Sequence, residues 1–181
     1  FFLKTDVMLL YLPLAHNFGR LMHLLGAHLG YTVAFLPDPR RIGDVMPQVR
    51  PTVLPTVPRV LEKVHSAVSA NFAAATGVRR RRVIGWALAV GEGVGALRQR
   101  QEPVPAGLAF KHRLADRLVY SKVKARLGGR LRAAISGGAP LAKEIAEFFH
   151  VIDILILEGY GQTEETTASN VNRPNPFKFG T

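Results

Sequence analysis

The fold of this protein is decided by residues 131–165, LRAAISGGAPLAKEIAEFFHVIDILILEGYGQTEE. The stretch begins with an apolar run, 131–135, and contains a second one, 154–157, and each run is typical of a buried strand. The residues between them, 141–149, predict a short helix. A strand, a helix and a strand in this order predict a βαβ unit, in which the two strands run parallel.

The same alternation of strands and helices continues through the rest of the chain. Strands are predicted at 7–12, 31–36 and 51–54, and helices at 15–29, 42–49, from Pro58 onward, 80–100 and 111–127. Pro47 disfavours the second of these helices, and the PVPAG sequence at 103–107 separates the last two. We therefore predict an α/β fold, with a largely parallel sheet flanked by helices and no linker that divides the chain into two domains.

The composition narrows the class of protein. With 181 residues, 48% of them hydrophobic, the chain is long enough for one domain with a sizeable core or for part of a larger one. The absence of cysteine excludes disulfides and thiolate metal sites, and it fits a reducing compartment such as the cytoplasm. No apolar run is long enough to span a bilayer, and the first residues do not resemble a signal peptide. Because both ends are abrupt and no methionine starts the chain, we expect a piece of a longer protein.

The net charge of +11 is concentrated in one segment, residues 77–132. This segment holds 14 of the 24 Lys and Arg residues but only 3 of the 13 Asp and Glu residues, so the remainder of the chain is neutral. Such a charge run is most often a solvated helical face. We expect the basic segment to attract anions, either acidic lipid headgroups of a membrane or a phosphate-bearing cofactor. Nucleic acid is not expected, because the aromatic residues Trp86, Phe110 and Tyr120 are isolated.

Two glycine-containing turns follow the two strands of the opening stretch. In the first, SGGAP at 136–140, adjacent glycines allow close approach of a ligand, although an ordinary turn with Pro140 at the first helical position explains it as well. In the second, Tyr160 offers a planar face, Thr163 a hydroxyl for a phosphate oxygen and Glu164 a ligand for Mg²⁺. The alternative is that Thr163 caps a helix. The turns face one crevice if their strands are neighbours.

A third candidate is His16, at the junction between the first predicted strand and the first predicted helix. This junction lies at the edge of the sheet where ligands bind in parallel α/β folds. A lone histidine is more often a structural or surface residue. A three-histidine metal site is not expected, because the spacings between His16, His23 and His28 do not place all three on one helical face.

Four blocks of sequence occur in an order that resembles a known family. They are LPLAHNFGR at 12–20, PTVLPTVPRVLEKV at 51–64, LGGRLRAAISGGAPL at 127–141 and LEGYGQTEETTA at 157–168. Together they resemble the AMP-forming long-chain fatty-acid–CoA ligases of the adenylate-forming superfamily. The resemblance implies a reaction in two steps: ATP and a fatty acid give an acyl-adenylate, and coenzyme A then displaces AMP to give acyl-CoA. ATP, Mg²⁺ and coenzyme A are the implied cofactors and substrates.

The resemblance also implies roles for individual residues. Tyr160 would stack on adenine, Thr163 would contact the α-phosphate, Glu164 would bind Mg²⁺ and His16 would orient the carboxylate. The remaining nucleotide-binding residues would line the adenine and acyl pockets largely through backbone atoms: Gly138, Ala139, Pro140, Glu158, Gly159 and Gly161. The family's phosphate loop, its ribose-binding aspartate and its C-terminal domain with a catalytic lysine have no counterpart in this sequence. We therefore expect residues 1–181 to be the central part of the large N-terminal domain and to be inactive in isolation.

Three residues depart from the family pattern. Glu165 stands where many relatives have a neutral residue, and we expect it to face solvent rather than to compete for the metal. Asn17 and Gly19 are also unusual in the histidine block and affect the local shape of the pocket. Two alternatives stay open: adenylation of another carboxylate, such as an aromatic or amino acid, and a non-catalytic basic module that binds nucleic acid or a membrane surface. The long insert at 77–127 favours the long-chain branch by resemblance.

Overall fold

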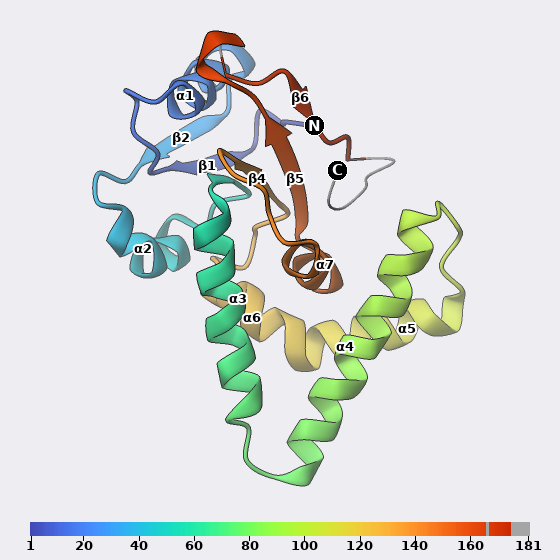
Figure 1. Cartoon of the computed structure of the whole chain (residues 1–181). Coiled ribbons are helices and arrows are strands. Elements are labelled where there is room, and N and C mark those ends of the chain that lie inside the picture. Colours follow the sequence, from blue (N-terminus) through green and yellow to red (C-terminus); the bar gives the residue numbers. More distant parts are fainter. Residues whose placement is uncertain (166, 175–181) are drawn as a thin grey trace.

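The computed structural model describes residues 1–165 and 167–174 and contains one mixed sheet (Figure 1). Its strand order is β2-β1-β3-β4-β5-β6, and all neighbouring strands are parallel except β6, which runs antiparallel to β5. The strands are β1 Val7–Leu10, β2 Thr32–Phe35, β3 Val53–Thr56, β4 Ala133–Gly137, β5 Leu155–Tyr160 and β6 Asn170–Val171. The predicted α/β fold with a largely parallel sheet is confirmed.

Helices cover the sheet and also extend away from it. They are α1 Asn17–Leu29, α2 Ile42–Val49, α3 Pro58–Ala73, α4 Val78–Gln99, α5 Ala106–Ala115, α6 Ser121–Arg126 and α7 Lys143–Val151, with short 3-10 turns η1 Pro39–Arg41 and η3 Thr163–Glu165. In Figure 1, α3 and α4 run to a common tip far from the sheet. Among the described residues, none of these helices combines the length and the apolar character needed to cross a membrane.

Several predicted boundaries were wrong. The helix predicted at 111–127 begins at Ala106, directly after Pro105, and continues through a π-helical segment η2, Asp116–Tyr120, into α6. The strand predicted at 51–54 continues through Pro55 to Thr56. Pro55 is tolerated because β3 pairs with β1 only at Val53, whereas its pairing with β4 continues to Thr56.

The strand predicted at 154–157 is longer and extends to Tyr160. Glu158 and Gly159 pair with Ser136 and Gly137 of β4, and β6, which the sequence pattern did not predict, pairs with the other side of this end. Hydrogen bonding to two neighbours therefore outweighs the low strand preference of glycine.

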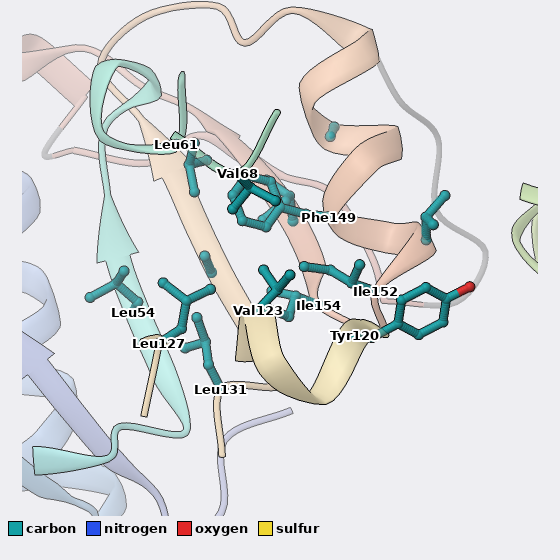
Figure 2. Close-up of a cluster of buried hydrophobic side chains, with 14 of the residues drawn as sticks. Leu54, Leu61, Val68, Tyr120, Val123, Leu127, Leu131, Phe149, Ile152 and Ile154 are labelled. Atoms are coloured by element: carbon teal, nitrogen blue, oxygen red, sulfur yellow. The ribbon is translucent and has the colours of Figure 1, made fainter. Parts of the chain in front are cut away.

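The sheet is covered on both faces, as its nearly continuous apolar strands require. On one face, α1 packs over a small cluster that includes Met8, Leu10 and Ile135. On the other face, a larger cluster joins β3, β4 and β5 to α3, α6 and α7, and Figure 2 shows Phe149 among its side chains. The Tyr120 hydroxyl donates a hydrogen bond to the Ala87 carbonyl, which attaches η2 to α4.

One carboxylate connects three helices to the turn that precedes β5. Asp153 accepts a hydrogen bond from Arg98 of α4 at 2.8 Å, and it lies 3.6 Å from Lys124 of α6 and 3.5 Å from His112 of α5. Burial lowers the pKa of the neighbouring His150 to about 4, so this imidazole is neutral at pH 7. The positions of the helices and of β5 are therefore linked by charge as well as by apolar packing.

Candidate functional site

The two predicted turns meet at the carboxyl ends of β4 and β5, which are neighbours in the sheet. Gly137 pairs with Gly159 at this edge, and a cavity of about 570 Å³ opens beside the pair. Its polar wall contains His16, Asn17, Tyr160, Gln162, Thr163 and Glu164, and its apolar wall contains Phe18, Leu21, Met22, Leu25, Ile135 and Leu157. The sequence predicted that the two turns face one crevice if their strands are neighbours, and β4 and β5 are neighbours.

The first turn requires glycine. Gly138 has φ +86°, a left-handed conformation that other residues rarely adopt. Helix α7 begins only at Lys143, so the explanation of Pro140 as the first residue of the helix is wrong. Ala139 and Pro140 line a second cavity of about 520 Å³, which shares His16, Phe18, Gly137 and Gly138 with the first. Glu158 lines neither of these two cavities.

His16 is positioned by its own hydrogen bond. It stands at the N-cap of α1 with extended backbone, and its Nδ1 accepts a hydrogen bond of 3.2 Å from the Phe18 N–H. A ring nitrogen that accepts carries no proton, so in the neutral imidazole the proton is on Nε2. The side chain is therefore both a helix cap and a donor at the wall of the cavity. His23 contacts the Phe35 ring instead, and the described residues contain no cluster of three His, Asp or Glu suited to a metal.

The second turn forms part of the wall of the same cavity. The Gln162 amide donates to the Tyr160 hydroxyl at 2.7 Å, and the ring of Tyr160, whose side chain is 60% exposed, stays available to a planar ligand. A side chain at position 161 would overlap the Thr167 carbonyl, which explains why glycine occupies this position. The Asn17 amide reaches the Thr163 carbonyl at 3.5 Å. Gln162 had no predicted role, and Asn17 had been noted only as a departure from the family pattern that affects the shape of the pocket. The Asn17 contact joins residues 146 positions apart, and such a contact has no sequence signature.

The two adjacent glutamates have different environments. Both are exposed, but Glu164 lines the cavity, whereas Glu165 lies outside its lining and its carboxylate accepts a hydrogen bond from the Ser169 hydroxyl. This agrees with the expectation that Glu165 faces solvent. Mg²⁺ is commonly bound by one or two carboxylates together with phosphate oxygens and water. A single glutamate therefore fits a metal that arrives with a nucleotide better than a metal held by protein ligands alone.

A parallel sheet whose neighbouring strand ends open into one cavity, lined by hydroxyl, aromatic and carboxylate groups, is typical of α/β proteins that bind a ligand at the carboxyl ends of their strands. The chain belongs to the AMP-binding enzyme family, whose model matches residues 2–180.

Curated relatives resemble nearly the whole chain. This chain is 34% identical to the long-chain-fatty-acid–CoA ligase FadD15 of Mycobacterium bovis, and the match covers 98% of this chain. It is 33% identical to long-chain-fatty-acid–CoA ligase 5 of Rattus norvegicus, and that match covers 97% of this chain. The chain spans only 29% and 24% of these two relatives.

Solved structures confirm the fold. The adenylation domain of a carboxylate reductase from Mycobacterium chelonae gives a TM-score of 0.64 at 22% identity, over 93% of this chain and 22% of that chain. ATP-bound MatB from Rhodopseudomonas palustris gives 0.56 at 22% identity, over 99% of this chain and 25% of that chain. The predicted fold, that of the N-terminal domain of adenylate-forming enzymes, is therefore correct.

Proposed function

We propose that the protein containing this chain is an ATP-dependent fatty-acid–CoA ligase. The observation that supports it is the cavity of about 570 Å³, which joins a polar wall at Thr163 and Glu164 to an apolar wall formed by α1. A reaction between a nucleotide phosphate and the carboxylate of an apolar chain needs both walls side by side. Family membership and the names of the curated relatives support the same class of substrate.

In the first step, a carboxylate oxygen attacks the α-phosphorus of ATP, and pyrophosphate leaves with the electron pair of the broken P–O bond. Because both reactants are anions, the site must offset their repulsion and hold them in line. We propose that the Thr163 hydroxyl donates to an α-phosphate oxygen and that Nε2–H of His16 orients the carboxylate. Glu164 would hold Mg²⁺, which neutralises the polyphosphate charge when bound.

The remaining groups to be bound are the adenine base of ATP and coenzyme A. Tyr160 would stack on adenine, while the backbone of Gly138, Gly159 and Gly161 permits close approach. Ala139, Pro140 and Glu158 do not line the cavity of about 570 Å³, here called the main cavity, and would act from the edge of the site. In the second step, the sulfur of coenzyme A attacks the acyl carbonyl carbon, the thiol proton is lost and AMP leaves.

The chain would be part of a larger catalytic unit. We propose that residues 1–181 are the central part of the large N-terminal domain, and that the phosphate loop, the ribose-binding aspartate and the lysine-bearing domain come from outside them. The short span of the chain on its curated relatives supports this proposal. The 181 residues alone would then lack ligase activity.

Exchange of pyrophosphate into ATP by the intact protein tests the proposed reaction. We expect Mg²⁺-dependent exchange that palmitate supports and that benzoate and the free amino acids do not. The apolar wall runs along α1 from Phe18 to Leu25, about two helical turns, which a long alkyl chain can cover and a single ring or a zwitterion cannot. Exchange supported only by aromatic or amino acids would instead establish the alternative substrate class. No exchange with any carboxylate, combined with salt-dependent binding to nucleic acid, would favour the non-catalytic alternative.

We also propose peripheral contact between segment 77–132 and anionic membranes. The segment combines its excess of cations with exposed Val78, Phe110 and Leu114. We expect Phe110→Ser to weaken binding of the intact protein to phosphatidylserine vesicles, measured by sedimentation. Leu24→Ser is the control, because Leu24 is also an exposed apolar residue, at 57% against 70% for Phe110, but lies on α1, outside the segment. Equal loss in both variants would contradict the proposed contact.

A further inference from the structure

A groove of about 490 Å³ lies between α3, α4 and the η2–α6 segment, outside the candidate site. Seven of its 12 lining residues are apolar, four are cationic, one is an amide and none is acidic. They are Val68, Phe72, Val83, Ile84, Leu118, Val119 and Val123, then Arg79, Arg80, Lys122 and Arg126, and Asn71. Its volume is within the range of about 300–1,000 Å³ that is usual for small-ligand sites.

The groove is formed by regular helix faces. Residues four apart lie on one side of a helix, so Val68 and Phe72 present one apolar face of α3. On α4, Arg79 and Val83 have the same spacing, so a cation and an apolar side chain lie side by side. On α6, Lys122 and Arg126 are also four residues apart, so two cations lie on one side of that helix. The apolar floor and the basic rim are therefore built by faces of three helical elements, of which η2 packs against α4 and continues into α6.

The rim carries an uncompensated charge. Within the part of the chain that the structure describes, none of Arg79, Arg80, Lys122 and Arg126 has a carboxylate within 4 Å. Like charges around one opening repel each other, and an apolar floor open to water is unfavourable. A ligand that relieves both costs has a single anionic head and an apolar chain.

We propose that this groove binds a long-chain carboxylate anion, with its chain on the apolar floor and its head among the four cations. The choice of a carboxylate head rests on the proposed function, because such a ligand would be that protein's own substrate. The groove is separate from the candidate site. Pro58 of α3 lines the second cavity and Phe72 lines the groove, and 14 residues of helix place these two positions about 21 Å apart.

Photo-crosslinking of the intact protein with a diazirine analogue of palmitate tests the proposal. We expect labelled peptides from residues 68–84 and 118–126, in addition to any from the candidate site. The double variant Arg79→Ala/Arg80→Ala should lower affinity at the groove about threefold to tenfold, because exposed charge contacts are individually weak. The matched control is Arg81→Ala/Arg82→Ala, which removes the same charge from the same helix outside the groove.

A second pair of variants tests the apolar floor. Leu118 lines the groove and Leu114 does not, although both are 41% exposed. Leu118→Gln should reduce labelling of the groove, and Leu114→Gln should leave it unchanged. Equal losses in either matched pair would overturn the proposal, since the effect would then be one of general charge or folding. Labelling confined to the peptides of α1, β4 and β5 would also overturn it.

The head group is tested by competition. Palmitate should displace the probe from the groove, and hexadecanol, which has the same chain length without the charge, should displace it much less. Complete displacement by phosphatidylserine vesicles, with none by palmitate, would overturn the carboxylate assignment. Pyrophosphate exchange measured on the same samples separates the two proposals: exchange without labelling of the groove contradicts only the groove, and labelling without exchange contradicts only the proposed reaction.

Discussion

Glu164→Gln should lower fatty-acid-dependent pyrophosphate exchange about 100-fold or more. Glu164 lines the main cavity, and it is the only carboxylate among the described lining residues of that cavity. Its amide analogue keeps the shape of the side chain but removes the charge that a hard divalent cation requires. The loss should appear in the rate at saturating ATP, and a higher Mg²⁺ concentration should restore part of it.

Glu165→Gln is the control for this variant. It removes the same charge from the next residue, whose carboxylate is hydrogen-bonded to Ser169 and lies outside the lining of the main cavity. We expect the rate of pyrophosphate exchange to stay within about twofold of that of the unmodified protein, because substitutions at exposed positions away from a cavity or a buried contact usually have small effects. If both variants lose activity to the same extent, the difference in role between the two glutamates is wrong and the local turn is the sensitive feature.

Phe149→Ala should destabilise the protein by about 3–5 kcal/mol. The residue is only 1% exposed and belongs to the larger apolar cluster (Figure 2). Its ring contacts that of Phe148 edge to face. Truncation leaves a cavity between α7 and the sheet that the surrounding side chains cannot fill completely. The change in the free energy of unfolding, from denaturant titration of the intact protein, measures the effect.

Phe110→Ala provides the comparison. This ring is 70% exposed on α5, so its removal should change the free energy of unfolding by about 0.5 kcal/mol or less. A similar loss for Phe110 and Phe149 would mean that burial in the larger cluster does not determine their contributions.

The parallel arrangement could be predicted because its signal is local. The apolar runs at 131–135 and 154–157, with an amphipathic segment between them, correspond to β4, α7 and β5. The end of β5 could not be placed, because the low strand preference of Gly159 is overcome by its partners Gly137 and Val171. β6 has only two residues and no periodicity, so it exists through pairing alone.

The sequence predicted that the two turns meet if their strands are neighbours, but not which of their residues share a cavity. The turn residues Tyr160, Thr163 and Glu164 line one cavity, and their individual roles stay predictions. That Ala139 and Pro140 line a neighbouring cavity depends on the positive φ of Gly138 and on where α7 begins, which the sequence does not reveal. The concentration of charge in segment 77–132 was visible in the sequence, whereas the groove depends on how three helical elements are placed relative to one another.

The hydrogen bond from the Phe18 N–H to Nδ1 of His16 ties one polar group of the cavity to the start of its apolar wall. The capping residue and the first apolar side chain of that wall are only 2 positions apart in the chain. A shift of α1 would therefore move the imidazole and the apolar side chains together. The spacing between the polar wall and the apolar wall is in this way built into the start of one helix, and neither can be repositioned by itself.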